Sequence, residues 1–400
     1  MTGSRPDGPA AVPGGPHGLA AAGGADTVGG AGGPGGAGGA DGGGPTLAVV
    51  GATGVVGGVL LEILSRRADV WGEIRLVDTP QAARAARSAG RKPSVRGVET
   101  EVFALDEDAF AGVDVAVFTG PDEISARWAP VAVAKGAIVI DGSGAFRMDP
   151  EVPLVVPEVN AHAARIRPRG IVASPSALAL SLSVVTGALH AEFGLSELVV
   201  SSYQAVSGAG RPGIDALRAQ LASVVVGTEL GTRPGDVRRA VGEGTGPFPA
   251  PVALNVVPWT GAGPDADGWS SEELGLRDET RKILGLPGLR IGATCVCVPV
   301  ITGHSMSVHA CFENEVSVGR AHEILANAPG IVVCDSPERG EFPTPADVVG
   351  TDPAWVGRVR RSPDDPKALA LFLCADNLRE GAALNLAQIA ELVAAEPTAP

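Results

Sequence analysis

The chain has 400 residues, with 31 Lys and Arg against 45 Asp and Glu, and a formal net charge of -14. This acidic balance argues against nucleic acid as a partner, because nucleic-acid binding depends on Lys and Arg neutralising phosphates. No uncharged apolar run reaches the roughly 18 residues that suggest a membrane span, so we expect no membrane association. A chain of this length is expected to form about two domains.

The first 45 residues differ from the rest in composition, because eighteen of them are Gly. Such a segment cannot bury enough apolar surface to offset the entropy lost on ordering, so we expect 1–45 to be a disordered tail. Its start, "MTGSRPDG", leads into no apolar stretch of the kind found in a secretory signal peptide.

The cysteines are five in number, and no secretion signal accompanies them. They are Cys295, Cys297, Cys311, Cys334 and Cys374. An odd number without a secretion signal favours free thiols in a reducing cytoplasm. No Cys or His cluster complements Cys295 and Cys297 as metal ligands, so we expect no metal site.

Apolar runs alternate with helical stretches in the first part of the ordered chain. Residues 46–64, "TLAVVGATGVVGGVLLEIL", predict a buried strand, a Gly-rich turn and an amphipathic helix. Further apolar runs follow at 74–78, 113–120 and 137–143. Strands that alternate with helices indicate βαβ units and a parallel sheet, so we expect a Rossmann-type dinucleotide-binding domain at 46–172.

The pattern changes in the second part of the chain. Longer alternating strands, such as "LSELVVSSYQAVSG" and "SMSVHACFE", are separated by helical segments. This is typical of an α+β domain with a larger mixed or antiparallel sheet, which we place at 173–375. The apolar residues of 376–395 recur at helical spacing, and we expect this helix to complete the first domain.

The glycine-rich turn after the first predicted strand indicates a dinucleotide site. Gly51 would allow a tight turn, Gly54 would let the backbone approach a pyrophosphate, and Gly57 would permit close packing of helix on sheet. The helix N-terminus would then offer N–H groups to the anion. The alternative is a tight turn that binds no ligand.

The second predicted strand ends in an acid that bears on the choice of cofactor. Asp78 would bind a ribose 2′-OH and repel a 2′-phosphate, which favours NAD. The nearby segment "ARSAGRK" contains Arg87, Arg91 and Lys92, which would receive a 2′-phosphate and favour NADP. A solvated basic turn explains these three residues equally well, and the sequence leaves the choice open.

Ten short blocks, in order, resemble aspartate-semialdehyde dehydrogenase, and the resemblance extends from about residue 46 to 395. The blocks are "GATGVVGG", "ARSAGRK", "VIDGSGAFRMDPEVPLVVPEVN", "SSYQAVSGAG", "VALNVVPW", "ETRKILG", "TCVCVPVITGHS", "FPTPADVVG", "VGRVRR" and "DNLREGAALN". The resemblance implies NADPH-dependent reductive dephosphorylation of β-aspartyl phosphate to aspartate semialdehyde. In the family's reaction a thiolate attacks the acyl phosphate, phosphate leaves, and hydride then reduces the resulting thioester. It also implies a homodimer formed through the α+β domain, which would be the catalytic and dimerisation domain.

The same resemblance assigns roles to several residues. His304 matches the general acid/base, Gln204 the substrate-orienting amide, Arg147 the phosphate clamp and Glu272 a substrate contact. Each has a structural alternative, since a buried His can bond within a core and an Arg can pair with a nearby acid. The expected cofactor-binding residues are Gly51, Thr53, Gly54, Val55, Val56, Arg87 and Ser88.

The sequence departs from the family at the nucleophile. The family's turn resembles "NPNCT", whereas here residues 174–178 are "SPSAL", so the cysteine position is Ala177 and the preceding Asn is Ser176. Alanine has no nucleophilic atom, so the family's covalent step cannot occur at this position.

Other site positions depart as well. The family's substrate-carboxylate Arg in "CVRVP" is Cys297, its substrate Lys is Gly275, and the Lys of its "NLRKG"-like stretch is Glu380. The turn after the third apolar run now contains Asp122 and Glu123, which would repel a pyrophosphate if they faced it.

Three hypotheses follow from these losses. The first is a family paralogue without the family's catalysis, acting in the cytoplasm as a homodimer or with an active relative. The second is an oxidoreductase with altered substrate or mechanism, in which Cys297 replaces the missing thiol; an inert, space-filling thiol is the simpler reading. The third is a regulatory protein that binds NADP, or NAD, without chemistry.

Overall fold

The computed structural model describes residues 43–67, 70–88, 92–224 and 229–396, and all structural statements below concern these residues. Most of the predicted disordered tail lies outside the described residues, and so does Arg91. Within the part of the chain that the structure describes, none of the helices combines the length and apolar character needed to cross a membrane.

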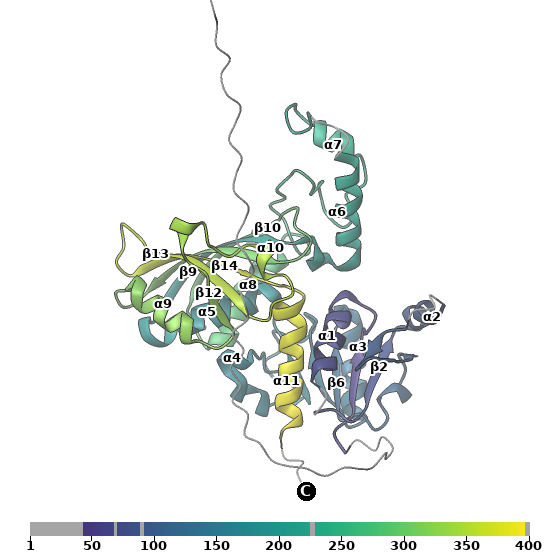
Figure 1. The fold of residues 1–400 in the computed structure, drawn as a ribbon. Coiled ribbons are helices and arrows are strands. Elements are labelled where there is room, and N and C mark those ends of the chain that lie inside the picture. Colours follow the sequence, from purple (N-terminus) through teal and green to yellow (C-terminus); the bar gives the residue numbers. More distant parts are fainter. Residues whose placement is uncertain (1–42, 68–69, 89–91, 225–228, 397–400) are drawn as a thin grey trace, which may run out of the picture. The chain divides into compact units, whose positions relative to one another are not determined.

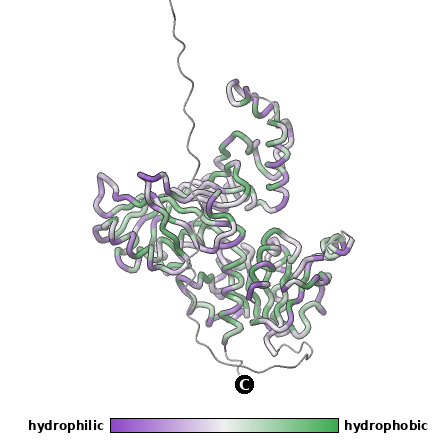
Figure 2. Tube along the Cα trace, viewed as in Figure 1, coloured by the Kyte–Doolittle hydropathy of each residue, from purple (hydrophilic) through white to green (hydrophobic). Residues whose placement is uncertain are grey.

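The first sheet has six parallel strands in the order β5-β2-β1-β6-β7-β8. Its strands are β1 (Leu47–Val50), β2 (Ile74–Asp78), β5 (Val102–Ala104), β6 (Val115–Phe118), β7 (Ile138–Asp141) and β8 (Ile171–Ala173). The strands are short and mostly apolar, as parallel strands buried on both faces usually are. Figure 2 shows hydrophobic residues along this sheet. The predicted Rossmann-type sheet is confirmed.

Helices cover both faces of this sheet, as the alternation of side chains along β6 shows. Val115 and Val117 join one apolar cluster with the C-terminal helix, whereas Ala116 and Phe118 join another. The helices are α1 (Val55–Arg66), α2 (Pro80–Ser88), α3 (Asp122–Ala134) and α11 (Asn385–Ala394), the last preceded by a π-helical turn, η5 (Arg379–Leu384). Helix α11 contacts α1, β6 and β7, so the end of the chain returns to the first sheet (Figure 1).

Short elements connect these strands and helices. They are β3 (Ser94–Val95), β4 (Val98–Glu99), η1 (Asp108–Phe110), α4 (Pro157–Asn160) and η2 (Ala161–Arg165). Strands β3 and β4 form an antiparallel pair outside the main sheet.

The second sheet is six-stranded and mixed, in the order β10-β9-β11-β14-β13-β12. Its strands are β9 (Leu195–Gln204), β10 (Arg290–Cys297), β11 (His304–Phe312), β12 (Ile331–Val333), β13 (Ala354–Arg361) and β14 (Ala368–Ala375). The β9–β10 and β12–β13 pairs are parallel and the others antiparallel, which confirms the predicted second α+β part.

Helices α5 (Ala177–Phe193), α8 (Ser271–Leu284) and α9 (Val318–Asn327) pack together on one face of this sheet. The remaining elements are η3 (Val206–Ala209), α6 (Gly210–Val224), α7 (Asp236–Val241), η4 (Pro337–Arg339) and α10 (Pro345–Val348). Helix α6 packs on η3 and α7, beside a small apolar cluster that includes Cys297.

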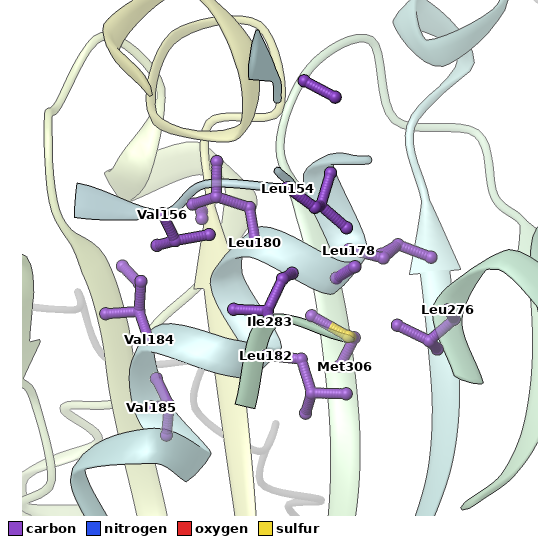
Figure 3. Close-up of a cluster of buried hydrophobic side chains, with 14 of the residues drawn as sticks. Leu154, Val156, Leu178, Leu180, Leu182, Val184, Val185, Leu276, Ile283 and Met306 are labelled. Carbon is purple, nitrogen blue, oxygen red and sulfur yellow. The ribbon is translucent and has the colours of Figure 1, made fainter. Parts of the chain in front are cut away.

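Helix α5 is apolar on nearly all sides, which is typical of a helix inside a core. Leu178 and Leu182 near its start are fully buried. In Figure 3, side chains from other parts of the chain lie around them, including Leu276 and Ile283 of α8 and Met306 of β11. This packing fixes where α5 begins, and that end carries the nucleophile position of the family.

Candidate functional site

A cavity of about 500 Å³ brings together most of the site residues expected from the sequence. Helix α1 and the ends of β6 and β7 contribute to it, and so do β9, β10, β11 and the start of α5. The sequence-predicted residues on its lining are Val56, Arg147, Ala177, Gln204, Glu272, Cys297 and His304. Residues remote in sequence, from both sheets, therefore form a single site.

The start of α5 forms one wall of the cavity. Ser176 is the N-cap, and its Oγ accepts a hydrogen bond from the Ala179 N–H at 3.4 Å. Ala177 is the first residue of the helix and packs closely on Gly381. A Cβ atom added at Gly381 would lie only 2.6 Å from the Cβ of Ala177. The helix N-terminus thus faces the cavity with a methyl group that cannot attack a carbonyl.

Arg147, the expected phosphate clamp, uses all three of its nitrogens within the protein. Nε donates to the Ser174 carbonyl at 3.0 Å and Nη2 to the Gly142 carbonyl at 2.9 Å. Nη1 forms an ion pair with Glu279 Oε1 at 3.3 Å. The guanidinium therefore lines the cavity with its charge already matched.

Glu279 is the partner that the sequence reasoning missed. Its side chain is buried, and its Oε2 accepts the Ser176 N–H at 2.6 Å, so one carboxylate holds both the nucleophile turn and Arg147. A pattern in the sequence does point to it: Glu272 and Glu279 are two turns apart on α8 and hence on one face.

Glu272 lies at the cavity, close enough to these charges to respond to them. Burial raises the pKa of its carboxyl, the nearby Glu279 carboxylate raises it further, and Arg147 opposes both effects. The balance shifts Glu272 toward its neutral, proton-donating form.

His304, the expected acid/base, is buried and uncharged in this setting. Its Nδ1 accepts the Ala205 N–H at 3.0 Å, so the neutral ring carries its proton on Nε2, which lies beside Gly208 at the cavity. Burial lowers the pKa of His304 to about 3. The ring can donate a hydrogen bond to a ligand, but accepting a proton there is unfavourable near neutral pH.

Gln204, the expected orienting amide, is held by hydroxyl groups. Its Nε2 donates to Ser202 Oγ and to Thr260 Oγ1, both at 3.2 Å. Its amide plane is therefore fixed at the cavity wall before any ligand binds.

The thiol of Cys297 also lines the cavity, but its surroundings suppress ionisation. It is buried in an apolar cluster, and burial raises its pKa to about 11. A reactive cysteine needs the thiolate, which is scarce at neutral pH with this pKa. The structure thus supports the space-filling interpretation of Cys297 rather than a substitute nucleophile.

Thiol labelling should show this difference directly. With iodoacetamide at neutral pH, we expect the half-buried Cys311 and Cys334 to react first and the three buried thiols, Cys297 among them, much more slowly, as mapped by mass spectrometry. The rate at Cys297 should rise about tenfold per pH unit until the pH nears its raised pKa, because only the thiolate reacts. Faster labelling of Cys297 than of Cys311 at neutral pH would contradict this.

The glycine turn has the geometry expected of a dinucleotide-binding loop. Gly51 has φ +89°, a conformation that favours glycine, and a Cβ at Gly57 would lie 2.3 Å from the Gly51 carbonyl oxygen. Asp78 accepts both the N–H and the hydroxyl of Thr53, at 3.0 and 2.6 Å. The acid at the end of β2 therefore braces the turn.

A second, more open cavity of about 820 Å³ borders this turn. Thr53, Gly54 and Val55 line it, and so do three cations: Arg66, which pairs with Glu62, and Lys92 and Arg211. Arg211 comes from the start of α6, far along the chain, and the sequence reasoning did not include it.

Four expected cofactor residues are not part of that lining: Gly51, Val56, which lies on the first cavity instead, Arg87 and Ser88. Arg87 donates to the Ala83 carbonyl and pairs with Glu101 at 3.7 Å, and Ser88 Oγ donates to the Arg84 carbonyl. The contacts of Arg87 and Ser88 are therefore made within α2 itself or with the neighbouring Glu101.

The structure also shows the surroundings of two other positions that differ from the family, Asp122 and Gly275. Asp122, one of the two acids expected near a pyrophosphate, accepts the Gly144 N–H at 2.8 Å. A Cβ at Gly275 would lie 3.4 Å from Glu279 Oε1, so a Lys at this position would begin beside the buried carboxylate.

Glu380 lies outside the main cavity, on another one of about 270 Å³. It is buried and accepts a hydrogen bond from Ser181 at 2.8 Å. Burial raises its pKa to about 8, Ser181 opposes this, and the acids Glu158 and Asp376 add to it. The carboxyl is therefore mostly protonated at neutral pH.

This buried carboxyl should make stability fall as the pH rises from about 4.5 to about 8. The folded pKa is raised above the unfolded one, so its stabilisation is complete below pH 4.5 and is lost as the pH rises through about 8. The loss cannot exceed ~1.4 kcal/mol per pH unit. We expect Glu380→Gln to flatten urea unfolding curves over this range, and Glu99→Gln, at an exposed carboxyl, to leave the slope unchanged.

Among the described residues, no group of three or more His, Cys, Asp and Glu side chains is arranged to hold a metal ion.

The parallel sheet, its glycine turn and the cavity shared with a mixed sheet define a nicotinamide-dependent dehydrogenase fold with two parts. Sequence models agree: residues 46–166 match "Semialdehyde dehydrogenase, NAD binding domain", and 187–380 match "Semialdehyde dehydrogenase, dimerisation domain". The chain therefore carries the family's NAD-binding and dimerisation domains.

Curated relatives and solved structures make the family more specific. The aspartate-semialdehyde dehydrogenase of Streptomyces akiyoshiensis is 43% identical over 88% of this chain and 98% of its own, and that of Corynebacterium glutamicum is 42% identical over 87% and 99%. The structure of aspartate semialdehyde dehydrogenase II from Vibrio cholerae complexed with ASA has a TM-score of 0.79 and 33% identity, covering 89% of this chain and 99% of its own. The chain belongs to the aspartate-semialdehyde dehydrogenase family.

Proposed function

We propose that this family member binds a nicotinamide cofactor and a small ligand but does not carry out the family's thioester chemistry. The observation that supports this most directly is Ala177 at the start of α5, where it faces the cavity. The one thiol on the described lining, Cys297, has a raised pKa, and the neutral His304 is poorly suited to accept its proton.

The decisive test is an activity assay on the full chain, purified from a host whose own enzyme has been removed. Reduction of NADP⁺ or NAD⁺ is followed with aspartate semialdehyde, with and without phosphate. We expect no phosphate-dependent rate above that of a mock purification. A phosphate-dependent rate that scales with protein concentration would overturn the proposal.

For the cofactor, we propose NADP, with NAD as the alternative. Lys92 and Arg211 on the cavity beside the glycine turn would receive a 2′-phosphate, while Asp78 is occupied by Thr53 and less free to bind a ribose hydroxyl. Calorimetry and thermal shifts with NADPH, NADP⁺, NADH and NAD⁺ test this, since a ligand that binds only the native state must stabilise it. No heat and no shift with any of them would end the cofactor proposal.

An oxidoreductase with altered substrate or mechanism is the second candidate. It is favoured by the retained cavity residues Gln204 and His304 and by the NAD-binding domain. Cofactor reduction with a panel of aldehydes and alcohols, in the absence of phosphate, would distinguish this candidate from the first.

We also propose a homodimer, formed through the face of the second sheet opposite α5. Val199 and Tyr203 of β9 are exposed on this face, and Tyr203 packs on Phe372 of β14. The match to the family's dimerisation domain supports the same conclusion. Pairing with an active relative through this face is the alternative.

Charge on this face should separate the protomers. We expect Tyr203→Asp to convert a dimer into a monomer in sedimentation velocity, because burying a carboxylate at an apolar interface without a partner is unfavourable. Val98→Asp, at an exposed apolar residue of β4, is the matched control and should leave the dimer intact. An unchanged sedimentation coefficient for a folded Tyr203→Asp variant would show that the interface lies elsewhere.

Domain limits and location complete the proposal. We place the first domain at 46–172 with 376–395 and the second at 173–375, which is consistent with α11 packing on β6 and β7. We propose a cytoplasmic location because all five cysteines are free thiols.

A further inference from the structure

Building on the proposed function, we infer that the cavity at Ala177 binds a small organic amine that carries no carboxylate or phosphate group. Three features of the described residues lead to this: the one Arg or Lys on the lining already has a carboxylate partner, the carboxyl group of Glu272 faces the cavity, and the remaining wall is largely apolar.

The shortage of free positive charge is the first feature. Arg147 is the only Arg or Lys on the described lining of this cavity. It already bonds the Ser174 and Gly142 carbonyls and pairs with buried Glu279. An anion at Arg147 would compete with the buried Glu279 carboxylate for the same positive charge, which makes binding of the anion less favourable.

The helix N-terminus is likewise occupied by an internal carboxylate. Glu279 Oε2 accepts the Ser176 N–H at 2.6 Å, so this donor at the start of α5 is already used. Ser176 Oγ accepts from the Ala179 N–H in the usual manner of an N-cap. An incoming phosphate would compete with a carboxylate that the fold holds in place.

The nearby lysine on α8 does not supply the missing charge. Lys282 Nζ donates to the carbonyls of Arg147 and Asp149 at 2.7 and 2.8 Å and to that of Val152 at 2.8 Å. All three protons of the ammonium are therefore used in holding the 147–152 segment. Lys282 stabilises the loop and leaves the cavity without a second cation.

The groups that do face the cavity suit a cation. Glu272 offers a carboxyl group that an ammonium would draw into its ionised form, and Thr260 offers a hydroxyl oxygen nearby. Phe248 and Trp259 form apolar walls that can cover a short carbon chain. Trp259 can also attract a cation through its ring face.

The inference is tested with two probes that share one carbon skeleton and one amine. L-2-Aminobutanamide ends in a neutral amide, whereas L-2-aminobutyrate ends in a carboxylate. With the full chain, we expect calorimetry to give at least about tenfold tighter binding for the amide and no heat with inorganic phosphate alone.

Three variants make the comparison specific to this cavity. Glu272→Gln should weaken amide binding about tenfold or more, while Cys297→Arg should reverse the order of the two probes by supplying a carboxylate partner. Asp278→Asn, on α8 and outside the lining, should change neither affinity. Thermal unfolding and circular dichroism of each variant establish that it is folded.

Two outcomes would overturn the inference: binding of the acid equal to or tighter than that of the amide, and no binding of either probe. These outcomes remain separate from the activity assay. Phosphate-dependent turnover of aspartate semialdehyde would overturn the proposed function, whereas equal probe binding without turnover would overturn this inference alone.

Discussion

Replacing three residues of the cavity should create the activity that the natural chain lacks. The variant Ala177→Cys with Cys297→Arg and Gly275→Lys is expected to reduce NADP⁺ in the presence of aspartate semialdehyde and phosphate. In a protease where the effect was measured, losing the nucleophile lowers kcat on the order of 10⁶-fold. We expect the triple variant to exceed the natural chain by on the order of 10³-fold or more, even with imperfect geometry.

The geometry at α5 favours this outcome. Gly381 fills the space on one side of Ala177, and the cavity lies on another, so a thiol at 177 has room only toward the cavity. The helix N-terminus would lower the pKa of that thiol, unlike the apolar cluster around Cys297.

The single variants make the experiment interpretable. Ala177→Cys alone should gain a rapidly alkylated thiol but little turnover, because the carboxylate and phosphate of the substrate would still lack cations. Ala177→Ser is the matched control and should gain neither. A folded triple variant with an accessible thiol and no turnover would show that losses beyond these three positions abolished the activity.

The fold was largely predictable because short apolar strands and the glycine turn leave strong local patterns. The two strands of the first sheet that were not predicted, β5 (Val102–Ala104) and β8 (Ile171–Ala173), have three residues each, which is too short to show a period. Strand β8 is followed directly by the turn before α5, so the sequence shows no separate apolar run that would indicate a strand. Its place in the sheet depends on pairing with β7, a contact that local pattern cannot reveal.

The residues of the site were predictable by resemblance, but their bonding was not. Arg147 was expected to be a phosphate clamp or to pair with an acid, but the sequence did not show that the acid is Glu279, 132 residues away in the chain. Asp78 was considered as a ribose contact, and the sequence did not show that it bonds Thr53 of the neighbouring turn. Both bonds join segments that only the folded chain brings together, so spacing along the sequence cannot predict them.

The same buried pair gives the largest expected effect on stability. Glu279→Ala leaves Arg147 without its counter-charge and the Ser176 N–H without its acceptor, in a site where the two side chains are 18% and 6% exposed. Removing one partner of a buried ion pair typically costs about 3–5 kcal/mol. We expect a loss near the lower end, about 3 kcal/mol, because Arg147 keeps two carbonyl partners.

Urea unfolding of the natural chain and four variants separates the contribution of the pair from that of its surroundings. If the two side chains act as a unit, Arg147→Ala with Glu279→Ala should lose less stability than the sum of the two single variants. Glu279→Gln keeps the shape and a hydrogen-bond acceptor for Ser176, so its loss should be smaller than that of Glu279→Ala. Additive losses would show that Arg147 and Glu279 act independently.

A matched control on the same helix tests whether the charge or the burial matters. Asp278 pairs with Arg277 on the half-exposed side of α8, where ion pairs contribute little. Asp278→Asn should therefore change the free energy of unfolding by less than about 1 kcal/mol. If both substitutions cost the same, the cavity wall does not depend on Glu279. In that case, the bonds from Glu279 to the Ser176 N–H and to Arg147 would not explain why these two groups are unavailable to an anion.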